Sequence, residues 1–347
     1  MLRKYFIGRF ASCFMMYIIF GSIVLTTVAS FAAQESANLI EGAKQERKIL
    51  YYTALPIQPD TTMMVDAFKV KYPFLDVDVF RLSGETLLMK VLAEAQAKAL
   101  KNDVFQCSIV QMSQMKQKGL LMKYVGPESK AYGPKFKDPD GYWNTSYIIP
   151  YVIAYNTKII PKADAPKSYE DLLKPKYKGK IGIDTDEVQW YFHLLKIMGR
   201  EKGIPFMKAL AKQDLLFRKG HTLLTTLCAA GEVPIVLVAY LQEVYNAQDV
   251  GSPIEWVLFE SSPTIAAINT IAIQNNAPHP NAAKLFYNFS ISEEGTAVLK
   301  KLSKNAATTK ALTTEVKGMD VYVAHPEELL ANYEQVTKEW KEIFNPK

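Results

Sequence analysis

The chain has 347 residues, of which 49% are apolar and 22% are charged, and its formal net charge is +6. This length exceeds what one small core organises, so we expect two domains, and the composition is that of an ordinary globular protein. The basic excess is weak and forms no dense basic stripe, which argues against a nucleic-acid-binding protein.

The first 32 residues read as a secretory signal peptide. Arg3, Lys4 and Arg9 precede an uncharged apolar run from Phe10 to Ala29, and small residues follow it. This order predicts cleavage after Ala32 and a periplasmic location. The apolar run is also long enough to span a bilayer, so an uncleaved membrane anchor is the alternative.

Beyond the signal, strand and helix patterns alternate, which predicts an α/β fold with mainly parallel strands. KILYYTAL, DVDVFRL and DVFQCSIV read as strands, with helices in DTTMMVDAFKVKYP and SGETLLMKVLAEAQAKAL between them. Cys107 and Cys228 both lie in apolar segments, so we expect buried free thiols rather than a disulfide or a metal pair.

Two extended apolar stretches contain a proline each and read as segments that cross between domains. The first is YIIPYVIAYNT with Pro150, and the second surrounds Pro263. Proline cannot donate to a strand ladder, so it fits an edge or a crossover better than a central strand. The simplest arrangement is two α/β lobes with a ligand cleft between them. We assign 46–149 and 258–347 to lobe 1 and 150–257 to lobe 2.

Motifs of familiar enzymes are missing from the sequence. It contains no G-x-S-x-G elbow, no H-E-x-x-H, no Walker loop and no G-x-G-x-x-G. The four histidines share no metal-ligand spacing with one another or with the cysteines, and His193, on an apolar helix, reads as a packed core residue. These absences point away from hydrolases of the familiar kinds.

Several segments together resemble one family, the periplasmic solute-binding proteins of ABC importers, of the ferric-iron-binding type. They occur in family order: AKQERKILYYTAL, DAFKVKYPFLDVDVFRLSGETLLMKVLAEAQA, DPDGYW, VIAYNTK, PKSYEDLLKPKYKGKIGI, AAGEVPIVLV and APHPNAAKLFYNFSISEEGTAVLKKL. The resemblance implies a two-lobed type II periplasmic-binding-protein fold whose lobes close on a small-molecule ligand by hinge bending. It also implies a binding protein rather than an enzyme, without a cofactor or a resident metal. Such a protein would be a monomer that delivers its ligand to the permease of an ABC transporter.

The resemblance does not extend to the iron ligands of the family. Iron-binding members use twin tyrosines, a histidine and a glutamate. Here the histidine's place falls near Pro56, the glutamate's place near Ser108, and only Tyr240 stands for the twin tyrosines. One hard ligand in place of four does not hold Fe³⁺ tightly. We therefore expect a small organic solute. The alternative is a ferric site rebuilt with Tyr147 and Tyr151.

The candidate site residues lie at strand ends and helix starts, where a cleft between lobes would place donors. They are Thr53, Leu55, Ser83, Gly84, Ser108, Tyr147, Asp186, His221, Thr222 and Tyr240. Ser83 and the His221–Thr222 pair open helices, where backbone N–H groups can hold an anion. A plain N-cap is the competing interpretation for each.

The segment DTDEVQW places three carboxylates at the expected start of a helix. Asp184-x-x-Glu187 is the spacing of a capping box, so the simplest interpretation is that the helix caps itself. The alternative is that Asp186 or Glu187 meets a cationic or hydroxyl-rich part of the ligand. A membrane-anchored ligand-sensing domain and a periplasmic enzyme remain the rival classes of function.

Overall fold

The computed structural model describes residues 37–55, 57–259, 262–301, 321–322 and 326–346. The expected signal peptide lies outside these ranges. Within them, no helix is both long enough and apolar enough to cross a membrane.

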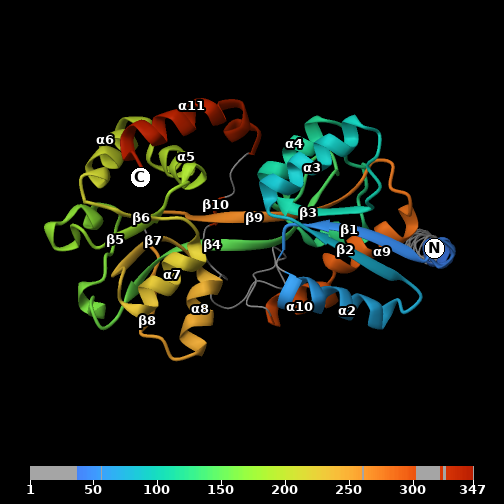
Figure 1. The fold of residues 1–347 in the computed structure, drawn as a ribbon, viewed down its shortest axis with the longest axis horizontal. Helices are drawn as coiled ribbons and strands as arrows, with labels where there is room; N and C mark the ends of the chain where they lie inside the picture. The colour runs from blue at the N-terminus through green and yellow to red at the C-terminus, as the bar shows by residue number, and fades with distance from the viewer. Residues whose placement is uncertain (1–36, 56, 260–261, 302–320, 323–325, 347) are drawn as a thin grey trace, which may run out of the picture.

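The strands form one sheet that runs through two lobes (Figure 1). Its strands are β1 (Lys48–Thr53), β2 (Asp76–Arg81), β3 (Val104–Ser108), β4 (Asn144–Asn156), β5 (Ile181–Asp184), β6 (Leu216–Arg218), β7 (Ile235–Tyr240), β8 (Ile254–Val257), β9 (Thr264–Ile273) and β10 (Val321–Tyr322). The order is β2-β1-β3-β9-β4-β7-β5-β6, with β10 on β9 and β8 on β4. The pairs β1–β2, β1–β3, β5–β6 and β5–β7 are parallel, as the alternating pattern predicts.

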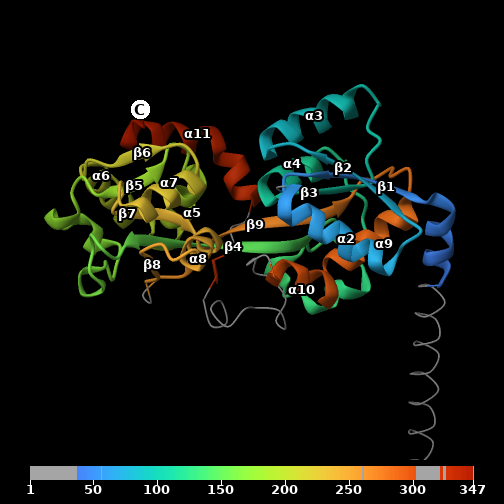
Figure 2. The same ribbon diagram turned by 60° about the horizontal axis from the view of Figure 1, so that its bottom comes forward.

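Helices cover the sheet in each lobe (Figures 1 and 2). In the first lobe these are α2 (Thr62–Lys71), α3 (Gly84–Gln96), α4 (Ile109–Gln117), α9 (Pro280–Ser290) and α10 (Glu293–Lys301). In the second they are α5 (Val188–Met198), α6 (Arg200–Ala211), α7 (His221–Ala230) and α8 (Leu241–Asp249). The last helix is α11 (Pro326–Phe344). The mixed α/β, two-lobed architecture expected from the sequence is confirmed.

Strands β4 and β9 connect the lobes. The first half of β4 pairs with β9 as far as Pro150, which lies opposite Ala266. From Tyr151 onward β4 pairs with β7 and β8 instead. Pro150 therefore stands where β4 changes partner, and Pro263 directly precedes β9. Each proline lies where a strand changes partner or begins, so neither interrupts a continuous ladder. Both prolines therefore mark the segments that cross between the lobes.

The C-terminal helix α11 belongs to the core of the second lobe. Its buried side chains Leu329, Val336, Trp340 and Phe344 pack with those of α5 and α6. The Trp340 ring lies 5.9 Å from Tyr191 of α5. We assigned all of 258–347 to the first lobe, whereas the apolar face of α11 is buried against the second (Figure 1).

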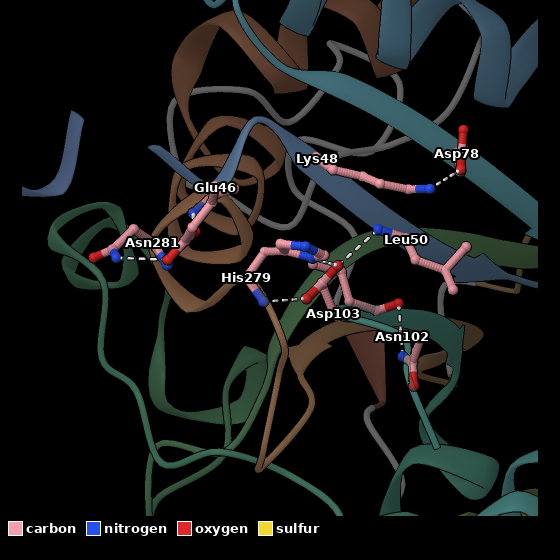
Figure 3. A network of polar contacts seen from close by, with 10 residues as sticks. Glu46, Lys48, Leu50, Asp78, Asn102, Asp103, His279 and Asn281 are labelled. Carbon is pink, nitrogen blue, oxygen red and sulfur yellow. Dashed lines mark hydrogen bonds and ion pairs between the residues drawn. The ribbon is translucent and has the colours of Figure 1, made fainter. Parts of the chain in front are cut away.

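A polar network holds together the amino-terminal edge of the first lobe's strands (Figure 3). The buried carboxylate of Asp103 accepts hydrogen bonds from Leu50 N at 2.7 Å and from His279 N at 2.8 Å, and it lies 3.0 Å from His279 Nδ1. Glu46 accepts bonds from the first N–H groups of α9, at Asn281 and Ala282, where a carboxylate complements the helix dipole. This network stabilises the end of the lobe opposite to Ser108.

Cys107 and Cys228 are free and buried, as their apolar surroundings predict.

Candidate ligand-binding site

The carboxyl ends of the parallel strands in the two lobes approach one another at the crossover. Strand β3 ends at Ser108, which lies opposite Asn269 of β9, close to the point where β9 meets Pro150. Strand β7 ends at Tyr240, opposite Tyr151. Ligands of open α/β sheets bind at such carboxyl ends, and here both lobes direct theirs to the same place.

Electrostatic interactions connect the facing lobes. Burial raises the pKa of Tyr147 well above its ordinary value, and Asp60 of the first lobe and Tyr240 of the second raise it further. Burial also raises the pKa of Tyr333 on α11, and both Asp186 and Glu85 add to that shift. The pKa values of these two tyrosines therefore respond to charged or ionisable groups on both lobes.

The second lobe brings Asp184, Glu187 and His221 together. One ligand atom from each residue lies within 4.8 Å of those of the other two. Asp184 is 8% exposed and Glu187 only 3%, so two carboxylates are buried beside an imidazole. Such a set of oxygen and nitrogen donors can hold a proton, a cation or a hydroxyl-bearing ligand.

Asp184 positions this group because it is the last residue of β5. Its Oδ2 accepts a hydrogen bond from Gly220 N at 2.6 Å, and its Oδ1 accepts one from Asp186 N at 3.0 Å. Gly220 has φ +109°, which only glycine adopts without strain. The bond therefore joins the end of β5 to the start of α7, where His221 follows.

The ring of His221 is held by one hydrogen bond and by stacking. Its Nδ1 lies 3.1 Å from the carbonyl oxygen of Val238, which can only accept, so Nδ1 carries the proton. Its Nε2 lies 3.2 Å from Glu187 Oε1. The ring stacks on Tyr240 at a centroid distance of 4.0 Å, and Tyr240 in turn stacks on Tyr151 at 5.6 Å.

Burial favours the neutral forms of Glu187, His221 and Tyr151. It raises the pKa of Glu187 well above its ordinary value, and the negative charges of Asp184 and Asp186 raise it further. Burial lowers the pKa of His221, against the opposing effect of its bond to Val238. The pKa of Tyr151 is raised by burial and then by Tyr240. A buried acid with like charges around it is a common feature of functional sites.

The expected capping box does not form, so that interpretation is wrong. Helix α5 begins at Val188, Glu187 occupies the N-cap position, and no side chain caps the helix. Asp184 lies in β5 and uses its carboxylate on Gly220 and Asp186. The acids therefore belong to the strand end and to the cluster with His221.

In the first lobe, Ser83 and Ser108 occupy the N-cap positions of α3 and α4, and neither side chain caps its helix. The Ser83 hydroxyl lies 2.9 Å from that of Thr86, and the Ser108 hydroxyl donates to Gln111. A Cβ on Gly84 would stand 3.3 Å from the Gln111 amide, so the two helix starts lie side by side.

The other candidate residues differ in accessibility. Thr53 and Leu55 are buried in the first lobe, and the Thr53 hydroxyl accepts a bond from Leu55 N. Tyr147 is buried in β4, whereas Asp186 and Thr222 are exposed.

The contact between Glu187 and His221 is not predicted by the sequence, because 34 positions separate the two residues. The only signal for this contact in the sequence is that an acid follows the end of one strand and a histidine follows the end of the strand that proves to be its neighbour.

Comparisons with known proteins agree with this architecture. Residues 102–318 match the model of a family described as bacterial extracellular solute-binding protein. An uncharacterised protein of Haemophilus influenzae is 25% identical over 280 residues, which is 77% of this chain and 78% of that protein. A Sinorhizobium fredii protein named "Probable ABC transporter periplasmic-binding protein y4fP" is 33% identical over 78 residues, 22% of each chain.

Among solved structures, iron-bound HitA from Pseudomonas aeruginosa superposes with a TM-score of 0.74 at 18% identity, covering 85% of this chain and 99% of HitA. AfuA from Actinobacillus pleuropneumoniae, with fructose-6-phosphate bound, has a TM-score of 0.72 at 21% identity, covering 86% and 99%. FutA from Trichodesmium, in complex with iron and citrate, has a TM-score of 0.72 at 18% identity, covering 86% and 100%. At these identities the structural likeness supports the fold.

Proposed function

The chain belongs to the bacterial extracellular solute-binding protein family, and on that premise we propose that it is a periplasmic receptor of an ABC importer. It captures a small polar organic solute between its lobes and presents it to the permease. Binding of this kind needs preorganised groups that face a closing site, and it needs no reactive nucleophile.

The observation that carries this proposal is the meeting of the two sets of strand ends, with a different chemistry on each side. The second lobe presents two buried carboxylates, the His221 ring and two stacked tyrosines. The first presents the starts of α3 and α4, and Arg81 at the end of β2. Helix starts and a guanidinium favour an anionic group, whereas the carboxylates favour a hydroxyl or a cation. A solute with both kinds of group fits between them.

A ferric site is the second candidate function. The Tyr151 and Tyr240 rings are nearly parallel, 9° apart, so two phenols stand side by side on the second lobe. This pair supports the alternative of a rebuilt tyrosine site. HitA, which shares the fold, is an iron-bound structure, whereas AfuA holds a sugar phosphate.

A thermal-shift screen of the periplasmic protein tests the proposal. The panel contains sugars, sugar phosphates, amino acids, polyamines, small carboxylates, and Fe³⁺ with and without carbonate. A ligand at 100 times its Kd adds about 2.7 kcal/mol of stability. We expect an organic solute to raise Tm, and Asp186→Asn and His221→Ala to reduce that rise. Stabilisation by Fe³⁺ alone would replace the organic ligand with the ferric alternative.

A further inference from the structure

Two acceptor atoms face each other near the end of β5, one on the buried Glu187 and one on the half-buried His221. His221 carries its proton on Nδ1, because its neighbour there is the carbonyl oxygen of Val238. In the neutral ring Nε2 then presents a lone pair, 3.2 Å from Glu187 Oε1. Although the two atoms are this close, Oε1 accepts no hydrogen bond among the described residues. A buried carboxylate oxygen without a partner is costly, so a shared proton or a cation between the two atoms is favoured.

From this geometry we propose that Asp184, Glu187 and His221 bind a divalent first-row transition-metal ion. The inference deepens the proposed function and rests on it, since the ion would lie among the same strand ends that hold the solute. It concerns a set of ligands confined to the second lobe, with none of the phenolates that the ferric alternative needs.

The separation of the donor atoms suits a shared ion. Bonds from zinc to nitrogen and oxygen measure about 2.0–2.2 Å, so two ligands at octahedral or tetrahedral angles stand about 2.9–3.5 Å apart. The distance of 3.2 Å between Nε2 and Glu187 Oε1 falls in that range. Asp184 completes the group, with all three ligand atoms within 4.8 Å of one another.

The surroundings orient the ligands as outer-shell groups do in metal sites. Ligating histidines donate their other ring N–H to a carbonyl or carboxylate, which sets the tautomer. Here Nδ1 makes this bond to Val238 and leaves Nε2 for the ion. Asp184 is likewise held by backbone N–H groups of Gly220 and Asp186. Its Oδ1 also accepts a bond of 3.4 Å from the Thr185 hydroxyl, whereas Oδ2 accepts only the bond from Gly220 and retains a lone pair for the ion.

The donors also indicate the class of ion. One imidazole and two carboxylates suit Zn²⁺, Mn²⁺, Fe²⁺ or Co²⁺, whereas soft ions prefer sulfur, and Mg²⁺ and Ca²⁺ prefer oxygen alone. The ion can arrive free, or as the chelate of an organic acid whose remaining carboxylates would face Arg81 and the helix starts of the first lobe. In both forms, the three side chains would bind the metal ion itself.

Isothermal titration of the whole protein, stripped with EDTA, tests the inference. The titrants are ZnCl₂, ZnCl₂ with citrate, and MgCl₂ as a control. We expect one Zn²⁺ per chain and no comparable binding of Mg²⁺. Tighter binding of zinc with citrate would identify the chelate as the form captured, and tighter binding of zinc alone would identify the free ion. A Co²⁺ titration adds the visible absorption of a protein-bound ion.

Three variants locate the ion. Glu187→Gln removes one ligand without changing shape. His221→Asn keeps an amide nitrogen near Nδ1 for the bond to Val238 but deletes Nε2. Glu255→Gln removes an exposed charge of the same lobe and is the matched control. We expect the first two to weaken Zn²⁺ binding at least tenfold, with the circular dichroism of the folded protein retained, and the control to leave it unchanged.

The outcomes separate this inference from the proposed function. Equal Zn²⁺ binding by the wild type and Glu187→Gln, or no binding with or without citrate, would overturn the metal site. In either case an organic solute that still raises Tm would leave the receptor function intact. If neither metals nor solutes bind, both proposals are wrong.

Discussion

The carboxylate of Asp184 accepts a hydrogen bond of 2.6 Å from the backbone N–H of Gly220. This contact joins the end of β5 to the start of α7, across 36 positions of the sequence. Because Asp186 N also donates to Asp184, one side chain sets the position of both the acidic turn and the histidine. The cluster of Asp184, Glu187 and His221 therefore depends on the end of β5.

Replacing Asp184 with asparagine tests this role. The amide keeps one acceptor but turns its NH₂ group toward either Gly220 or Asp186, so one of these two partly buried backbone donors loses its partner. We expect the free energy of unfolding to fall by about 1–3 kcal/mol. Urea denaturation measures the change, with the exposed Glu232→Gln as control. Equal stability of the two variants would show that Asp184 does not hold the turn.

The burial of His193 should make the stability of the protein depend on pH. His193 is 1% exposed, and neither ring nitrogen has a hydrogen-bond partner among the described residues. Burial lowers the pKa of His193 from the ordinary 6.5 to about 3. The unfolded chain therefore takes up a proton first as the pH falls. This residue's contribution to stability is complete above pH 6.5 and is lost as the pH falls toward 3.

The loss approaches about 1.4 kcal/mol per pH unit between those limits. Denaturation of the wild type and of His193→Leu at pH 7, 6 and 5 isolates the contribution. We expect the wild type to lose stability relative to the variant as the pH is lowered. Parallel curves for the two proteins would mean that His193 is not buried in its neutral form.

The burial of Trp340 leads us to expect that this side chain contributes strongly to the packing of α11 against the second lobe. The side chain is fully buried, its ring centroid lies 4.3 Å from that of Phe344, and its Nε1 donates to Thr185 O at 3.4 Å. Trp340→Ala should lower the free energy of unfolding by about 3–5 kcal/mol, because it empties a large volume in the core. Trp340→Phe keeps an aromatic ring and loses the N–H, at about 1 kcal/mol.

Urea denaturation compares the two Trp340 variants, and hydrogen exchange follows the amides of α5. Loss of protection in α5 is expected for the alanine variant alone. If exchange in α5 is the same in both proteins, α11 is not part of that core.

The two buried thiols give a chemical test of the fold and of the N-terminus. Burial raises the pKa of Cys107, and it raises the pKa of Cys228 to about 12, so neither is a thiolate at neutral pH. We expect no reaction with Ellman's reagent in the native protein and two thiols per chain after unfolding. A third thiol would be Cys13 and would show that the signal segment is retained. Fast reaction of the native protein would contradict the burial.

Much of the fold could be predicted because its patterns are local. The strand pattern DVDVFRL lies over β2, and Pro150 stands where β4 changes partner. The docking of α11 could not be predicted. Its helical period shows an apolar face, but that face does not specify which lobe covers it.

The site could be predicted only in part, for a similar reason. Ser108 and Tyr240 stand at positions that correspond to iron ligands of the family, and both lie at the crossover. The contact between Glu187 and His221 depends on the neighbouring order of β7, β5 and β6, which only the sheet reveals. The capping box was inferred from spacing alone, and it fails because β5 extends to Asp184.

Small-angle X-ray scattering, with and without the solute that raises Tm most in the screen, tests the central claim most directly. If the ligand is held between the lobes, it draws them together. We expect the radius of gyration to fall on saturation and to return to its original value when the ligand is removed. An unchanged radius of gyration at a concentration where titration confirms saturation would contradict capture between the lobes.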